Sequence, residues 1–247
     1  MNVRITTLAE RPELADLVWD MPDSWPEFMD HDPISWSMFG LVTADPEYTV
    51  VATDESGTLV GHGHSVPFSR ALPGRGGDLP DTGWDQVLMW ANSDLRKKVA
   101  PDTISAVEIS VHTGHQGKGL SGLLVTALRD NARAKGFGEM FAPVRPSAKH
   151  LEPRTPMSEY AYRTRKDGLP ADPWLRVHVR AGGEIVKIAP ASMVIPGSLA
   201  QWREWTGLPF DTDGPVELPF ALSTVHCDTV QDSAVYVEPN VWVRHAL

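Results

Sequence analysis

The chain contains 247 residues, of which 42% are hydrophobic and 22% are charged, a composition typical of a globular protein with one core. Its formal net charge of −10 argues against a nucleic-acid-binding protein, which needs clustered cations, and favours a cationic small-molecule partner. The single cysteine, Cys227, excludes an intrachain disulfide, and no window approaches the ~20 apolar residues of a membrane-spanning helix. We therefore expect a cytoplasmic protein that does not bind membranes.

The first part of the chain predicts an alternation of strands and helices. Apolar residues at every second position indicate strands, and apolar residues three or four apart indicate helices. Gly57 is placed to close a hairpin, because glycine adopts turn conformations readily. In chain order we expect a strand at 3–8, a helix at 11–20, helical pieces within 21–42, strands at 48–53 and 58–65, a loop at 73–83, a helix at 85–99 and a strand at 104–112.

The segment 104–145 is the best defined and predicts a strand, a glycine-rich loop, a helix and a second strand at 139–144. Lys135 and Gly136 are placed to end the helix, since cations and left-handed glycines favour helix C-termini. The helix is indicated by an apolar stripe with helical spacing, made of Leu120, Leu123, Leu124, Ala127 and Leu128.

The remaining sequence predicts a polar, irregular insertion at 146–171 and then shorter elements. Asp172 can cap a helix and Pro173 suits its first turn, which predicts a helix at 174–181 that two glycines end. We expect a strand at 184–188, a helix at 198–206 and strands near 221–226 and 234–243.

The glycine-rich loop between Val111 and Gly122 is the most informative motif. Small residues at a strand-to-helix junction allow backbone N–H groups to converge on an anion, and the helix dipole favours the negative charge. Lys118 adds a positive charge nearby. This pattern predicts a site for a pyrophosphate.

Two other phosphate loops and a structural turn are alternatives. A Walker A loop requires serine or threonine after the lysine, but Gly119 follows Lys118. The spacing of Gly117, Gly119 and Gly122 satisfies the dinucleotide-binding pattern, but four residues separate these glycines from the strand. The nearest acid of the second strand, Glu139, also lies at its beginning rather than near its end. A structural glycine turn that binds no ligand is the remaining alternative.

Residues 116–121, Gln-Gly-Lys-Gly-Leu-Ser, resemble motif A of the GNAT superfamily of N-acetyltransferases. In that motif an apolar strand and a short turn precede Gln/Arg-x-x-Gly-x-Gly/Ala at the start of a long helix. Ser121 stands where glycine or alanine is usual, and it is small enough for a phosphate to approach. Residues 172–186 are similar to a late helix of the family and its following strand. The resemblance covers about 1–190, apart from insertions at about 70–85 and 146–171, and we expect 191–247 to complete the same domain.

The resemblance implies an α/β (α+β) fold with a mixed, mostly antiparallel central sheet that is splayed at the acyl-CoA site and flanked by helices. The co-substrate would be acetyl-CoA or a similar acyl-CoA, with no metal. Its pantetheine arm would enter the split and pair with one strand edge, and its pyrophosphate would meet the loop amides. The expected binding residues are Ile109, Val111, Gln116, Gly117, Lys118, Gly119, Leu120, Ser121 and Gly122.

Family chemistry is direct attack of an amine on the thioester, which calls for a base and an acid. Neutralising a lysine-like amine at pH 7 costs about 4–5 kcal/mol, which a general base offsets. Glu108 is the candidate base, on the strand face of Ala106 and Ser110. His178 occupies the position of the tyrosine that usually protonates the thiolate, and histidine changes charge near neutrality. A structural salt bridge and a buried, hydrogen-bonded histidine are the alternatives.

His62 and His64 alternate on one predicted strand, and two histidines at this spacing can ligate a metal. Because no further ligands with recognisable zinc spacing accompany them, we expect them to line the acceptor cleft or to hydrogen-bond to the sheet. Trp25 and Trp36 are the candidate aromatic residues of the acceptor pocket. The basic run at 163–166 is a surface loop that could reach the CoA phosphates.

Together these features predict an N-acyltransferase, most simply an N-acetyltransferase, that acts in a ternary complex on a small-molecule amine. The negative net charge favours a cationic amine. The alternative is a sensor or scaffold that binds acyl-CoA without turnover, because His178 replaces the usual tyrosine. The sequence leaves open whether the protein is a monomer or a homodimer.

Overall fold

The structure, a computed structural model, describes residues 2–22 and 25–247. The helical pieces expected within 21–42 therefore include two positions, 23 and 24, outside the described residues. Seven α-helices occur in the described chain: α1 (Ala15–Asp20), α2 (Pro33–Val42), α3 (Gly83–Lys97), α4 (Leu120–Ala134), α5 (Met157–Tyr160), α6 (Pro173–Arg180) and α7 (Leu199–Thr206). Short 3₁₀ turns cover Pro12–Leu14, Glu27–His31, Pro46–Tyr48, Thr113–His115 and Lys149–Leu151.

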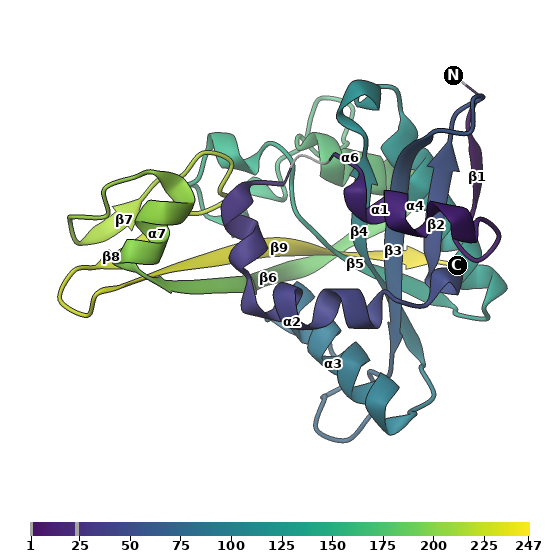
Figure 1. Ribbon diagram of the computed structural model, residues 1–247, viewed down its shortest axis with the longest axis horizontal. Coiled ribbons are helices and arrows are strands. Elements are labelled where there is room, and N and C mark those ends of the chain that lie inside the picture. The colour runs from purple at the N-terminus through teal and green to yellow at the C-terminus, as the bar shows by residue number, and fades with distance from the viewer. Residues whose placement is uncertain (1, 23–24) are drawn as a thin grey trace.

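The described strands form one mixed sheet in the order β1-β2-β3-β4-β5-β9-β8-β7, and β6 pairs with the free side of β9 (Figure 1). Each of these pairs is antiparallel except β4 with β5. The expected mixed, mostly antiparallel sheet is thus confirmed. The strands are β1 (Arg4–Thr7), β2 (Thr49–Thr53), β3 (Leu59–Phe68), β4 (Thr103–Val111), β5 (Glu139–Val144), β6 (Gly183–Ser198), β7 (Gly214–Val216), β8 (Val225–Asp228) and β9 (Ser233–Ala246).

The parallel strands β4 and β5 separate after two residue pairs. Ile104 pairs with Met140 and Ser105 with Phe141, and residues 106–111 of β4 have no partner on β5. The other edge of β4 stays paired with β3 as far as Val111. The sheet therefore splays where the resemblance implied, and one edge of β4 faces the opening.

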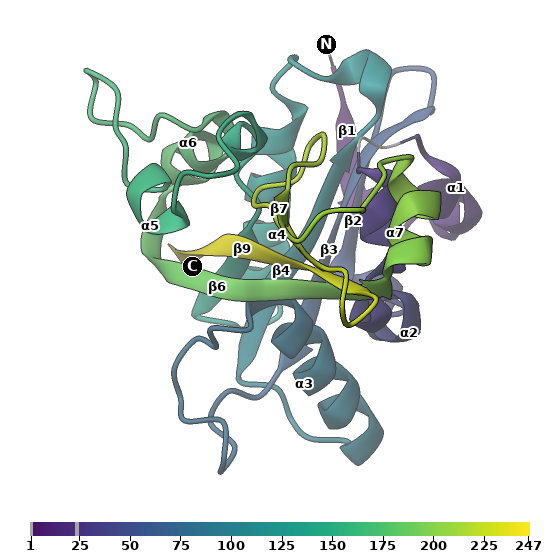
Figure 2. The same cartoon turned by 90° about the vertical axis from the view of Figure 1, so that its left-hand side faces the viewer.

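Helices cover both faces of the sheet, because the strands carry apolar residues on each side. Leu124 and Leu128 of α4 join a buried cluster with Ile104 on one face. Val87 and Leu88 of α3 join a second cluster on the other face. Figure 2 shows α3 on one side of the β6–β9 pair and α5 and α6 on the other.

A bulge in β4 changes the face on which Glu108 lies. Glu108 pairs with His64, but the next pair is Ala106 with Ser65, so Val107 is an extra residue in the strand. The Val107 carbonyl accepts a hydrogen bond from the Trp84 indole at 2.8 Å instead. The expectation that Glu108 shares a face with Ala106 is wrong, because the extra residue interrupts the alternation. Ala106 packs on the α4 side, whereas Val107 joins the cluster on the α3 side.

The segment after residue 190 extends the same sheet. The predicted strands near 184–188 and 234–243 are parts of the longer β6 and β9, which continue past β5 and carry β8, β7 and α7 (Figure 1). The Trp202 indole of α7 donates to the Ala234 carbonyl at 2.9 Å and fixes this helix on the extension. None of the described helices is long and apolar enough to span a membrane.

Candidate active site

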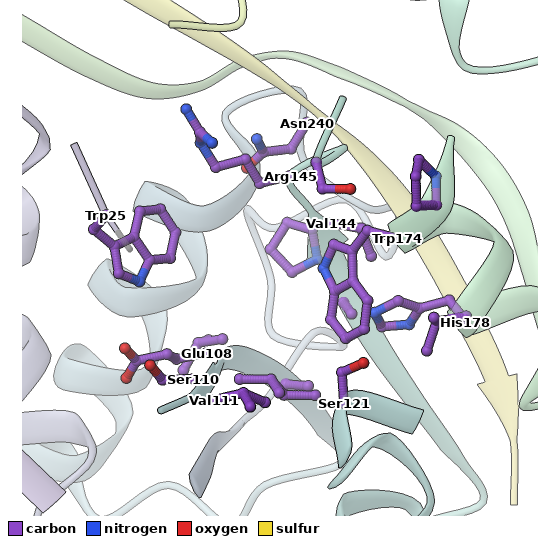
Figure 3. Close-up of a pocket in the computed structure, with 18 of the residues that line it drawn as sticks. Trp25, Glu108, Ser110, Val111, Ser121, Val144, Arg145, Trp174, His178 and Asn240 are labelled. Atoms are coloured by element: carbon purple, nitrogen blue, oxygen red, sulfur yellow. The ribbon is translucent and has the colours of Figure 1, made fainter. Parts of the chain in front are cut away.

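A cavity of about 640 Å³ opens where β4 and β5 separate. Its walls come from both strands, the loop after β4, the start of α4, and α6. Figure 3 shows Glu108 and Trp25 on one side of this cavity and Trp174 and His178 on the other. Its volume lies within the range of small-molecule sites, and its position between the splayed strands suits an extended ligand arm.

Seven of the nine expected coenzyme-binding residues line this cavity: Ile109, Val111, Gln116, Gly117, Gly119, Leu120 and Ser121. Lys118 does not line it, because its ammonium group donates to the Gly114 carbonyl at 2.9 Å within the loop. Gly122 lies in the first turn of α4, where a β-carbon would come within 3.8 Å of the Val177 side chain of α6.

The loop reaches α4 through two left-handed residues. Gly117 has φ of 74° and Gly119 has φ of 82°, a conformation that side chains with a β-carbon rarely adopt. The first N–H groups of α4 lack acceptors within the helix and point toward its N-terminal end. Gly136, with φ of 88°, ends the helix as expected. This geometry can bind an anion beside the cavity through backbone groups.

Glu108 lies at the border between this cavity and a second one of about 230 Å³. Both cavities share Trp25, Trp84, Val107, Glu108 and Met193. The second cavity is additionally lined by Val18, Trp19, Met21, Met29, Asp30, Ser35, Phe39 and His62.

The Glu108 carboxylate is surrounded by donors. Burial raises the pKa of this carboxyl, but hydrogen bonding and charge from His62, the nearby His64 and the Trp25 indole outweigh burial and lower the pKa overall. The carboxyl is therefore ionised at neutral pH. Burial lowers the pKa of His64 to about 4 despite the attraction of Glu108.

His178 is fully buried on α6, whose start is capped by Asp172 as expected, through bonds from the N–H groups of Trp174 and Leu175. Its Nδ1 lies 3.0 Å from Nε2 of His245 on β9. Burial, with a smaller effect of His245, lowers the pKa of His178 to about 3. Burial and the Arg129 guanidinium lower the pKa of His245 to about 4. The expectation that His178 changes charge near neutrality is therefore wrong.

The structure also locates the other residues that the sequence singled out. Trp25 lines both cavities, but Trp36 lines neither described cavity and is 85% exposed. Arg163 of the basic run is paired with Glu152 and Glu159. His115, in the 3₁₀ turn after β4, also lines the large cavity.

Some cavity residues were missed because no sequence pattern connects them to the motif. Arg145 follows β5 and pairs with Glu238 of β9 at 3.0 Å, although the two residues are 93 positions apart in the chain. Asn240 of β9 also lines the large cavity. The only signal for these positions would have been the pairing of β5 with β9, which is non-local.

Comparison with known proteins identifies the class. Residues 11–151 match the Acetyltransferase (GNAT) family, so the chain belongs to this family and is an acetyltransferase. The predicted family, fold and N-acetyltransferase activity are thus confirmed.

Among individual proteins, the chain is 33% identical to arginine N-acetyltransferase avaD of Aspergillus versicolor over 275 residues, which cover 98% of this chain and 93% of that protein. The loading GNATL domain of CurA from Lyngbya majuscula has a similar fold, with a TM-score of 0.59 and 17% identity, over 99% of this chain and 96% of that one. The GNAT-like decarboxylase GphF in complex with isobutyryl-CoA gives a TM-score of 0.55 at 15% identity, over 100% and 99% of the two chains.

Proposed function

We propose that this enzyme transfers the acetyl group of acetyl-CoA to a nitrogen atom of arginine or of a closely related cationic amine. The observation that carries the proposal is the position of Glu108 between a cavity of coenzyme size and a smaller, acidic and aromatic cavity. The full-length relative that acts on arginine supports this choice of acceptor.

The smaller cavity suits a cationic acceptor. Asp30 and Glu108 supply negative charge, and the side chains of Trp19, Phe39 and Trp84 supply aromatic surface. Aromatic rings attract guanidinium and ammonium groups, by about 0.5–2 kcal/mol according to how well water is excluded. A volume of about 230 Å³ is smaller than sites for drug-sized ligands and is consistent with one amino acid.

The larger cavity suits acetyl-CoA. The pantetheine arm pairs with the open edge of β4 at Ile109 and Val111, and the pyrophosphate contacts the backbone between Gln116 and Ser121. The Lys118 ammonium group stabilises the loop by its hydrogen bond to the Gly114 carbonyl. It attracts the phosphates by its charge and does not contact them directly. The acetyl group is then carried toward Glu108.

The two sides of the large cavity divide the chemistry between them. The amine nitrogen attacks the thioester carbon, so that a C–N bond forms and the C–S bond breaks. A protonated amine loses two protons in all, one before the attack, which makes the nitrogen nucleophilic, and one after it. Glu108 accepts each in turn and releases it to solvent. The sulfur leaves as a thiolate, which takes a proton from solvent as CoA departs.

His178 acts on the leaving sulfur as a neutral hydrogen-bond donor. An imidazole with a pKa of about 3 carries no extra proton at neutral pH, but its free N–H still stabilises developing negative charge. His245 is the positioning residue: when its Nε2–H donates to Nδ1 of His178, the proton of His178 is on Nε2.

The test is a turnover assay with purified enzyme and acetyl-CoA, in which free thiol is measured with arginine, agmatine, lysine and an uncharged amine. Tandem mass spectrometry assigns the acetylated nitrogen. We expect arginine to give the highest kcat/KM. If acetyl-CoA binds but none of these amines releases thiol, the proposed class of acceptor is wrong. Faster turnover of the uncharged amine would overturn cationic recognition.

A further inference from the structure

Three side chains converge beside the junction of the two cavities. His62 and His64 project from β3, and Glu108 projects from the paired strand β4, where His64 lies directly opposite it. The Glu108 Oε2 atom lies 3.6 Å from His62 Nε2 and 3.7 Å from His64 Nε2. One ligand atom from each residue lies within 4.8 Å of the others.

The histidine side chains are held in place by the protein. His62 is 4% exposed and His64 is 1% exposed. The Nδ1 atom of His64 lies 2.8 Å from the Thr49 hydroxyl, which fixes the ring and leaves Nε2 toward Glu108. Within the described chain, His64 Nε2 has no hydrogen-bond partner. When the Nδ1–H group of His64 donates to the Thr49 hydroxyl, the Nε2 atom of His64 carries a lone pair. This lone pair faces the Glu108 carboxylate and is repelled by it. A cation bound between the two groups removes the repulsion.

We propose that His62, His64 and Glu108 form a binding site for a divalent transition-metal ion of the Zn²⁺ type. Tetrahedral zinc with ligand bonds of about 2.0–2.2 Å brings its ligand atoms to about 3.3 Å from one another. The two distances to Glu108, 3.6 and 3.7 Å, are each a few tenths of an ångström longer. The two imidazole nitrogens lie within 4.8 Å of each other, so side-chain adjustments that shorten all three distances would close the site around an ion.

The ligand chemistry selects among ions. Imidazole nitrogen with one carboxylate suits Zn²⁺, Co²⁺, Cu²⁺ or Fe²⁺, whereas Mg²⁺ and Ca²⁺ prefer sites made of oxygen. His64 also has the outer partner that metal-bound histidines usually have, the Thr49 hydroxyl. Glu108 and His62 line the smaller cavity, so the remaining coordination position faces the acceptor.

The bound ion would inhibit the acetyl transfer, a consequence that rests on the proposed role of Glu108. A carboxylate that coordinates zinc cannot accept the proton of the amine. The ion and the cationic acceptor also compete for the same negative charge. Arginine should therefore protect the enzyme from zinc, whereas acetyl-CoA should not.

The experiment measures metal binding without acetyl-CoA, so its outcome is independent of turnover. Full-length protein is titrated with Co²⁺, and the visible absorption of four-coordinate cobalt is recorded; Zn²⁺ affinity is measured by competition and by calorimetry. We expect one cobalt ion per chain with intense visible bands that zinc removes. Colourless protein, or no saturable zinc binding, would overturn the site.

Variants distinguish these ligands from other histidines. His62→Ala and His64→Ala should each abolish the cobalt bands, and His226→Ala, an exposed histidine of β8, should leave them unchanged. Thr49→Val keeps all three ligands but should lower the affinity for zinc by about tenfold or more, because the hydrogen bond to His64 is lost. Circular dichroism and CoA affinity report whether each variant folds. Unchanged cobalt spectra in folded His62→Ala would refute the assignment, even if arginine proves to be the acceptor.

Discussion

The two cavities are built from different kinds of sequence. The larger cavity takes the largest single part of its wall from one continuous stretch, β4, the glycine loop and the start of α4, which offers backbone groups. The acceptor cavity takes side chains from α1, α2, α3, β3, β4 and β6. The difference teaches that a shared coenzyme can be bound by a local motif, whereas acceptor choice depends on contacts that only the folded chain creates.

Removal of the proposed base gives the largest expected effect. Glu108→Gln keeps the size of the side chain and one accepting oxygen but cannot accept a proton, so kcat should fall by roughly 10²–10⁴-fold. Affinity for CoA, measured by calorimetry, should stay the same if the cavities are independent. A comparable loss of CoA affinity would show that they are not.

The substitution Gly119→Ala tests whether the backbone of the glycine loop binds the pyrophosphate of CoA. A β-carbon at φ of 82° costs about 1–2 kcal/mol, and the loop relieves the strain by moving away from the phosphates. The Kd for CoA should rise roughly tenfold, and the KM for the acceptor should change little.

Gly136→Ala is the matched control for this change. Gly136 has a similar φ of 88° but lies at the other end of α4, outside both cavities. Its substitution should lower the Tm to a similar extent without changing the Kd for CoA. An equal increase in the Kd for CoA in the two variants would argue against pyrophosphate binding by the glycine loop.

The buried pair of His178 and His245 should make the free energy of unfolding depend on pH. Because the folded pKa values of His178 and His245 are about 3 and about 4, below the unfolded value, the unfolded state binds more protons as the pH falls below ~6.5. Stability that is present above pH 6.5 is therefore lost in acid. Each histidine should account for roughly 1–2 kcal/mol of unfolding free energy between pH 7 and pH 5.

Urea unfolding of the wild type and of His178→Gln at these two pH values measures this loss, which should be smaller in the variant. His178→Gln retains a neutral N–H donor, so its kcat should exceed that of His178→Ala. If the alanine variant is equally fast, His178 has only a structural role.

The acceptor cavity is tested by Asp30→Asn, for which we expect the smallest effect. Loss of one partly solvated charge near a cationic acceptor should raise the KM for arginine by roughly fivefold, about 1 kcal/mol. The KM for an uncharged amine should not change. Glu27→Gln, an exposed acid outside both cavities, is the control. An equal response in both variants would indicate general electrostatic attraction instead.

The sequence predicted the helices that border the larger cavity well, because local periodicity, glycine spacing and caps determine those segments. The apolar stripe beginning at Leu120 and the glycine at position 136 gave the bounds of α4 almost to the residue. The cap at Asp172 likewise located α6. Each of these signals lies within about twenty residues of the element that it predicts.

Features that depend on tertiary arrangement were predicted poorly. The bulge at Val107 turns Glu108 to the other face, and strict alternation in the sequence gives no sign of it. Trp36 resembled Trp25 as an aromatic pocket residue, yet α2 presents Trp36 to solvent. His245 could not be connected with His178 before the pairing of β6 with β9 was known.

The position of β9 has a consequence for biosynthesis. This strand lies between β5 and β6 but is translated after both of them. Until it emerges from the ribosome, the edges of β5 and β6 that pair with β9 therefore have unpaired backbone N–H and C=O groups. The wall behind His178 is also missing until His245 emerges. Nascent chains stalled before β9 should therefore expose these edges to chaperones and neither adopt a protease-resistant state nor retain CoA.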